Sequence, residues 1–215
     1  DWRVKPRWWA VAFGLPLLAA AIITASLLVL AGPVDLGQEL VSPLIILALF
    51  LWSVVLSGGL NEEPGWRGFA QARLNERYGA LAASLLIGAV WAGWHLPYFV
   101  IPVTPHSSFP LVNQIGWFGG ILTYSVILAW LYNSTGSVLL VMVLHAMINT
   151  ADVVIPLAPD QILVDGIIDQ SAVSLVTVVH LGVYVLAAIA IVAYFGHEKL
   201  ARGEIPTASD VGDRE

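Results

Sequence analysis

The chain contains no cysteine in its 215 residues, which excludes disulfides, thiolate metal sites and a cysteine nucleophile. Charged residues are also scarce, at 11% against 58% hydrophobic residues, and the mean hydropathy is +0.82. No cluster of Lys and Arg is large enough to indicate nucleic-acid binding. The composition therefore predicts a lipid bilayer as the surroundings and no nucleic acid as a partner.

Long uncharged runs predict how often the chain crosses the membrane. A helix needs about 20 apolar residues to span a bilayer. We predict an all-α polytopic membrane protein with about six transmembrane helices around a polar intramembrane site. Short or re-entrant helices would add to this number. The predicted spans are 8–31, 41–58, 79–98, 114–132, 137–156 and 172–195. They form one transmembrane domain, residues 1–201 with a motif core at 57–150, and a polar tail, 202–215, predicted to be disordered.

The distribution of basic residues predicts the orientation. They flank the first, second and last spans: Arg3, Lys5, Arg7, Arg67, Arg73, Arg77, Lys199 and Arg202. The loop after the first span and the loop at 157–170 carry acidic residues instead. Because cytoplasmic loops are enriched in Lys and Arg, both termini are predicted to be cytoplasmic. Small size and low lysine content favour a prokaryotic plasma membrane.

Two adjacent glutamates, Glu62 and Glu63, lie close to Arg67 in this apolar chain. A charged group at membrane depth costs about 3 kcal/mol or more unless it is paired or faces a wet cavity. Glu63 and Arg67 are four residues apart and can pair on one helical face, which leaves Glu62 for another role. The simpler alternative is that both acids cap a helix N-terminus. The apolar surroundings favour a functional role.

Two further polar sites lie on other predicted helices. His95 follows Trp91 by one turn, and His145 and Asn149 share one helical face. Taken alone, each is a weak signal, and a single histidine is better explained by a buried hydrogen bond or by interhelical contacts. His180, alone on the last span, is assigned to such packing. Ionisable sites on three different helices together favour one common functional site.

Several common hydrolytic motifs are missing. The sequence has no Gly-x-Ser-x-Gly and no His-Glu-x-x-His, and its spans lack the pair of aspartates of an aspartyl protease. The remaining chemistry is water activated by Glu62, either directly or on a metal. His145 and Asn149 are placed to donate hydrogen bonds to a developing oxyanion. This inventory fits amide hydrolysis.

The three motifs together resemble the CPBP (Abi) intramembrane proteases, a family that includes type II CAAX prenyl endopeptidases and bacteriocin-processing or immunity proteins. The matching features are Glu62-Glu63-x-x-x-Arg67, an aromatic residue one turn before His95, and His145-x-x-x-Asn149. The extended string Glu-Glu-Pro-Gly-Trp-Arg-Gly-Phe makes the resemblance specific, and it covers roughly residues 57–150. The chain departs from the family at Trp91, where phenylalanine is usual.

The resemblance implies an endopeptidase whose cavity opens to the cytoplasmic leaflet. Its substrate would be a membrane-embedded or lipidated peptide or protein, prenylated CAAX termini being the eukaryotic case. Carried over, Glu62 would activate water and His95 would bind or orient it. His145 and Asn149 would stabilise the oxyanion.

The resemblance also implies a supporting set and a candidate metal. The expected supporting residues are Glu63, Arg67 and Trp91. Family members are commonly described as metalloproteases, and Glu62, His95 and His145 would supply three ligands to one divalent ion, with zinc the first choice. A metal-free glutamate mechanism fits the same residues, so both alternatives remain open.

Two other functions are open from the residues alone. Intramembrane Glu and His also occur in proton or metal-cation transporters. The sequence shows no internal repeat of the kind many transporters have. A non-catalytic partner that confers immunity by binding is the third alternative. We rank the protease first and the transporter second.

The six-span prediction creates a conflict of depth. Glu62 follows the second span, near the cytoplasmic side, whereas His95 lies about 24 Å along a helix that begins near residue 79. The two side chains can meet only if residues 57–77 enter the membrane. We therefore predict that this segment penetrates the bilayer and does not lie flat on it.

Overall fold

The computed structural model describes residues 2–31, 42–102, 107, 109–154, 163–164, 167–168 and 170–212. Its helices are α1 (Pro6–Ala31), α2 (Pro43–Val55), α3 (Gly59–Glu63), the π-helix η1 (Pro64–Gln71), α4 (Ala72–Tyr78), α5 (Ala80–Trp94), α6 (Pro97–Val100), α7 (Leu111–Thr135), α8 (Val138–Val154), α9 (Gln170–Phe195) and α10 (Ala208–Gly212). Two short antiparallel strands, β1 (Leu163–Val164) and β2 (Ile167–Ile168), connect α8 to α9. The all-α prediction is confirmed.

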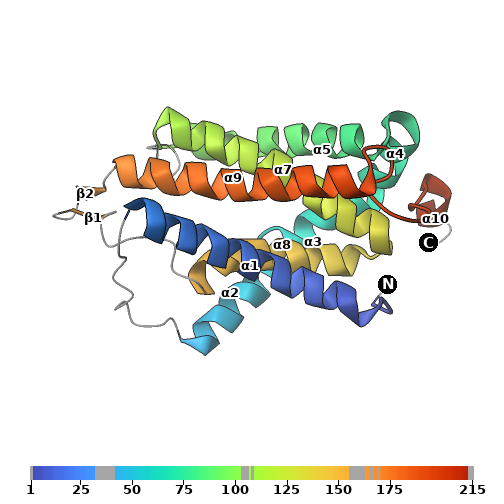
Figure 1. The fold of residues 1–215 in the computed structure, drawn as a ribbon. Helices are drawn as coiled ribbons and strands as arrows, with labels where there is room; N and C mark the ends of the chain where they lie inside the picture. The colour runs from blue at the N-terminus through green and yellow to red at the C-terminus, as the bar shows by residue number, and fades with distance from the viewer. Residues whose placement is uncertain are drawn as a thin grey trace.

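Five helical stretches are long and apolar enough to cross a membrane: Pro6–Leu30, Pro43–Tyr78, Ala80–Val100, Leu111–Thr135 and Ser174–Phe195. The shorter apolar helix Val138–Ala151 lies among them and completes the bundle. Successive long helices run in opposite directions, and both termini lie at the same end of the molecule (Figure 1). The prediction of a polytopic helical membrane protein is confirmed.

The second crossing is broken in its middle. Helix α2 ends at Val55, and Gly58 then adopts a φ of 114°, which favours glycine. The Gly58 N–H donates to Asn61 Oδ1 at 2.8 Å, and the chain continues through α3, η1 and α4 to Tyr78. The break falls at residue 58, where the sequence prediction ended the second span, and Glu63 and Arg67 beyond it are buried inside the bundle.

This geometry removes the conflict of depth. The turn at Gly79, with a φ of 76°, reverses the chain between α4 and α5. Glu62 lies 17 residues before this turn and His95 lies 16 residues after it, so the two reach similar depths. Glu63 and Arg67 are fully buried, in agreement with the prediction that residues 57–77 enter the bundle.

Helices α7 and α8 form the centre of the bundle. Helix α8 packs against α1, α2 and α7, and α7 also packs against α5 and α9. The residues of α8 from Leu140 to Ile148 are all buried. A helix that is apolar on all sides belongs in the interior, and this position places His145 at the centre of the protein.

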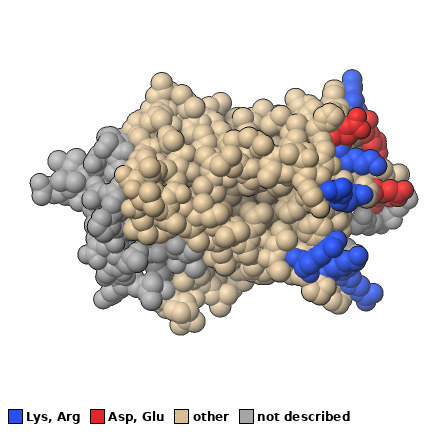
Figure 2. Space-filling view, in the orientation of Figure 1, with Lys and Arg blue, Asp and Glu red and all other residues tan. Residues whose placement is uncertain are grey.

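Charged side chains gather at the end of the molecule that carries both termini (Figure 2). Backbone hydrogen bonds from Ala80 N to Glu198 O and from Leu81 N to His197 O join α5 to the end of α9 there. The described part of the predicted tail reaches the same end, where Ala208 N–H donates to Glu76 Oε1 at 2.7 Å. The acidic loops that follow the first and fifth spans lie largely outside the described residues.

Candidate active site

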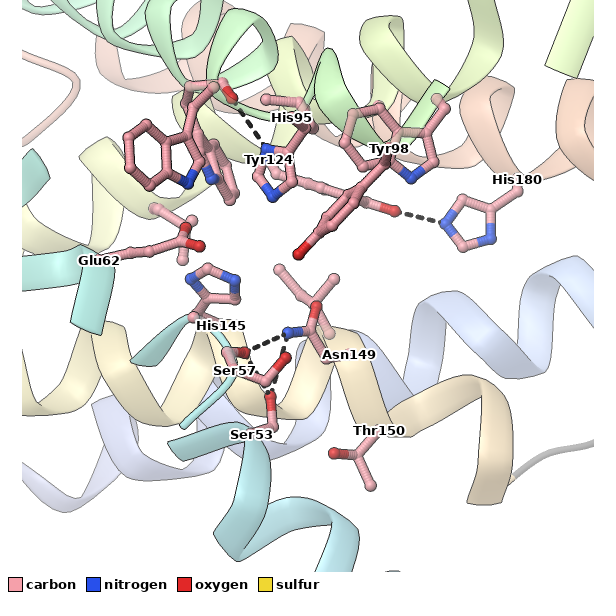
Figure 3. A pocket seen from close by; sticks show the side chains of 18 of the residues that line it. Ser53, Ser57, Glu62, His95, Tyr98, Tyr124, His145, Asn149, Thr150 and His180 are labelled. Carbon is pink, nitrogen blue, oxygen red and sulfur yellow. Dashed lines mark hydrogen bonds between the residues drawn. The ribbon is translucent and has the colours of Figure 1, made fainter. Parts of the chain in front are cut away.

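One cavity of about 830 Å³ is lined by all four residues predicted to be catalytic: Glu62, His95, His145 and Asn149. They come from α3, the end of α5 and the inner face of α8, and they face a common space (Figure 3). Small-molecule and peptide sites typically occupy about 300–1,000 Å³. The tertiary structure therefore assembles the site that the three separate motifs indicated.

Glu62 points into this cavity from α3 (Figure 3). The residue is half-buried, and its Oε2 is a buried oxygen without a hydrogen-bond partner in the described part of the chain. A buried polar atom without a partner is costly unless water or a ligand satisfies it. This oxygen is thus suited to hold a water molecule in the cavity.

Glu63 points away from the cavity and is fully buried. Its Oε2 lies 3.1 Å from Arg67 Nη1, which confirms the predicted pairing along one helical face. Its Oε1 lies 2.6 Å from His145 Nδ1, so His145 donates its Nδ1–H to the carboxylate. The ring of His145 is therefore held by an acid 82 residues earlier in the chain, a contact that no spacing indicated.

Arg67 connects the buried Glu63–His145 pair to the surrounding helices through hydrogen bonds. Its Nη2 donates to Ser125 Oγ of α7 at 3.0 Å, and Ser125 Oγ donates to Ser84 O of α5 at 2.7 Å. The guanidinium lies 5.4 Å from the ring centre of Trp91, which packs edge-on against His145 at 5.2 Å. Trp91 thus packs against both the guanidinium and the imidazole, which are joined to each other through Glu63 Oε1.

His95 caps the C-terminus of α5. Its Nδ1 lies 2.9 Å from Trp91 O, so Nδ1–H donates to the carbonyl and Nε2 is left for the cavity. The ring packs against Trp117 of α7 with centroids 4.9 Å apart. Pro97 follows at the start of α6, where the regular helix has ended. The imidazole therefore has a fixed tautomer and a fixed orientation.

Asn149 makes contacts that sequence reasoning did not predict. Its Nδ2 donates to Ser53 Oγ at 3.0 Å and to Ser57 O at 3.1 Å, which ties α8 to the end of α2. Both amide hydrogens are thus engaged, and donation to a substrate requires one of these bonds to be exchanged. The only sequence signal for Ser53 and Ser57 was their polarity within an apolar helix.

Tyr98 is a further cavity residue that sequence reasoning missed. It lies on α6, one turn after His95, and the two rings have centroids 5.6 Å apart. Its hydroxyl points into the space between His95 and Asn149 (Figure 3). The i,i+3 spacing from His95 was the available signal.

The donor groups only partly fit the expected metal. His95 and His145 each have Nδ1 bound to an oxygen, the arrangement usual for histidines that ligate through Nε2. Within the described residues, however, no three His, Asp or Glu side chains come together in a group that could hold an ion. The zinc site of Glu62, His95 and His145 stays a prediction, and no catalytic step is derived through it.

Replacing Gly58 by alanine is expected to abolish activity and to destabilise the protein by about 1–3 kcal/mol. A Cβ there would lie 2.5 Å from His145 Nε2, at a φ of 114° that other residues rarely adopt. Gly65→Ala is the matched control, because a Cβ at Gly65 meets nothing within 4 Å. Thermal unfolding and peptide cleavage measure the two effects. Equal behaviour of the two variants would contradict the close approach of His145 to the helix break.

Comparison with known proteins agrees with this geometry. The family model described as type II CAAX prenyl endopeptidase Rce1-like matches residues 42–151, just over half of the chain. The chain belongs to this family. All seven residues of the predicted site fall inside the match, whereas helix α9 lies outside it.

One curated relative shows the same similarity at the level of sequence. CAAX prenyl protease 2 of Methanococcus maripaludis is 33% identical over 102 residues, which cover 45% of this chain and 37% of the relative. The match thus spans little more than a third of the relative's length. Membership of an endopeptidase family confirms the resemblance and favours the peptidase over the transporter.

Proposed function

We propose that the protein is an intramembrane endopeptidase that hydrolyses a peptide bond with water activated by Glu62. The observation that carries this proposal is the buried, unpartnered Oε2 of Glu62 in a cavity shared with two oriented histidines. A base close to the reacting water, in a low-dielectric pocket, is the arrangement that general-base catalysis needs.

In the proposed first step, a water molecule lies between Glu62 and His95. The Glu62 carboxylate takes a proton as the water oxygen adds to the carbonyl carbon of the substrate. His95 holds the water through Nε2, because its Nδ1–H is already committed to Trp91 O. Fixing the water beside the base supplies orientation as well as proton transfer.

In the second step, His145 stabilises the oxyanion. Its Nδ1–H is donated to Glu63, so it donates from Nε2 only as an imidazolium, with the Glu63 carboxylate shared between His145 and Arg67. Asn149 joins by exchanging one of its bonds to α2. The tetrahedral intermediate then collapses: the C–N bond breaks, and the leaving amine takes the proton held by Glu62.

The proposed substrate is a membrane-embedded or lipidated peptide or protein, prenylated CAAX termini among them. The relative's name, CAAX prenyl protease 2, supports this class. The walls of the cavity support it as well, because the aromatic side chains of Trp52, Trp94 and Tyr98 line it and are 59%, 70% and 48% exposed. An apolar, membrane-associated peptide segment suits walls of this kind.

Cleavage of quenched-fluorescent peptides by the purified protein in detergent tests the proposal. The set includes a farnesylated CAAX peptide, and wild type is compared with Glu62→Ala, each with and without a metal chelator. Loss of cleavage in the variant is expected. Inhibition by the chelator would favour the zinc mechanism, and resistance would favour glutamate alone. Equal cleavage by wild type and Glu62→Ala would contradict the assigned base.

The proposed location is a prokaryotic plasma membrane with both termini in the cytoplasm. In the described part of the chain, every Lys and Arg except the buried Arg67 belongs to the terminal segments or to helix α4, and these meet at one end. Because positively charged segments are retained in the cytoplasm, this end is assigned to the cytoplasmic side.

A further inference from the structure

Helix α9 lines the active-site cavity although the family match ends before it. The match covers residues 42–151, whereas α9 begins at Gln170. Four residues of α9 nevertheless line the cavity that holds the predicted catalytic groups: Val176, Thr177, His180 and Leu181. The wall formed by α9 is therefore a place where this chain can set a specificity of its own.

A hydrogen-bonded pair on this wall joins α9 to α7. Tyr124 Oη and His180 Nε2 lie 2.5 Å apart, and both residues line the cavity (Figure 3). The buried Tyr184 packs against both rings, with centroids 4.8 Å from Tyr124 and 4.9 Å from His180. The interhelical contact predicted for His180 is present, and it holds two polar side chains in place on the cavity wall.

The Tyr124–His180 pair lies apart from the catalytic base. Figure 3 shows Glu62 on one side of the cavity and His180 on the other. Gly120 lines the cavity beside the pair, and a Cβ at this position would lie 3.7 Å from Tyr124 Cε2. The missing side chain leaves room next to the phenol. A peptide whose reacting bond lies at Glu62 can therefore place a residue from further along its chain against the pair.

The surroundings of the pair are mostly apolar. Ile121, Leu128 and Leu181 line the cavity from the same two helices. Asn113 and Thr177 are also polar, but Asn113 Nδ2 donates to Thr177 Oγ1 at 2.6 Å, nearer the start of both helices. A polar pair among apolar neighbours distinguishes ligands that offer it a hydrogen bond from ligands that cover it without one.

Hydrogen-bonding capacity indicates what the pair can bind. A phenol and a neutral imidazole carry two polar hydrogens, and the bond between the two rings uses one of them. The other can be donated to an oxygen of a ligand by exchange of a hydrogen bond. The described lining contains no Lys or Arg, so a carboxylate at the pair would be buried without a cation. An uncharged carboxamide or hydroxyl group fits these donors better.

We infer that Tyr124 and His180 form a specificity subsite that selects an uncharged hydrogen-bonding side chain, a carboxamide or a hydroxyl, in an otherwise apolar substrate peptide. The inference rests on the proposed function for the cleavage itself, and it adds what the peptide carries away from the reacting bond. An apolar side chain at this place covers the pair without offering it a hydrogen bond. We expect the polar side chain to be preferred by about 10–100-fold in kcat/KM.

Isosteric peptides test this subsite. Quenched-fluorescent peptides carry either Gln or Met, or either Thr or Val, at each position on both sides of the cleaved bond in turn. With wild type we expect one position at which Gln is preferred over Met or Thr over Val. The pair of peptides that responds identifies the selected group as a carboxamide or a hydroxyl. Tyr124→Phe is expected to reduce the preference to within about twofold.

Two further variants separate recognition from folding. Tyr124→Phe/His180→Leu removes both polar groups, so neither is left without its partner, and it is expected to lose the preference as well. Tyr132→Phe removes a hydroxyl from another buried tyrosine of α7, one that lies outside the cavity lining. This control is expected to keep the wild-type preference.

Binding of the same peptides, fluorescently labelled, to Glu62→Ala measures the preference without catalysis. Fluorescence anisotropy gives the affinity for each peptide, so a failure of the proposed hydrolysis is distinguishable from a failure of the subsite. The inference would be overturned if wild type and Glu62→Ala showed no preference at any position. An equal preference in wild type, Tyr124→Phe and the double variant would overturn it as well.

Discussion

Glu62→Gln is expected to lower the rate of peptide cleavage by about 10²–10⁴-fold, the range typical for loss of a general base. The amide keeps the size of the side chain and still fills its place on α3. It cannot accept the proton of the attacking water or return it to the leaving amine. Substrate binding depends on cavity residues from other helices, so KM is expected to stay unchanged. The loss is expected in kcat, because Glu62 acts on the reacting water.

The matched control is Glu76→Gln, which removes one negative charge from an exposed position at the charged end. Its rate is expected to stay within twofold of wild type. Thermal unfolding of both variants separates loss of catalysis from loss of folding. If the Glu62→Gln variant retained more than a tenth of the wild-type kcat, Glu62 would not be the general base, and another group would have to take that role.

Arg67→Met is expected to destabilise the protein by about 3–5 kcal/mol, as the removal of one partner from a buried ion pair commonly does. The substitution keeps the apolar volume but leaves the Glu63 carboxylate, fully buried, without its guanidinium. It also removes the hydrogen bond to Ser125 that joins η1 to α7. The readout is thermal unfolding in detergent, followed by tryptophan fluorescence.

The double variant Glu63→Gln/Arg67→Met distinguishes an uncompensated charge from lost packing. Since no full charge is left unpaired, it is expected to recover a large part of the stability lost in Arg67→Met. Its activity is expected to stay low, because His145 loses the carboxylate that orients it at 2.6 Å. Equal stability of the single and double variants would show that the charge of Glu63 is not the cause.

Much of the fold follows from the sequence alone. Every backbone polar group in lipid must be satisfied internally, so long uncharged runs form helices, and their number and order can be read directly. The site residues were also identifiable, because ionisable groups are costly in lipid and therefore conspicuous there. Glu63 and Arg67, four residues apart, form the pair that helical geometry dictates.

The contacts that bury the chain beyond Gly58 were decided by the tertiary structure. Hydropathy counts Glu62, Glu63 and Arg67 as breaks in a span, so by itself it gives no sign that this segment is buried. In the folded protein Glu63 and Arg67 pair with each other inside the bundle, and the helical segments continue to Tyr78. A scale based on single residues cannot register compensation between residues.

The sequence by itself determined the helical membrane fold, the candidate residues of the site and the placement of basic residues. Only the tertiary structure decided that Glu63 holds His145 across 82 positions, that Asn149 is tied to α2, and that the three motifs line one cavity. The physical reason is the distance along the chain over which each effect acts. Spacing along one helix and the cost of charge in lipid act locally, whereas contacts between helices depend on how all of them pack.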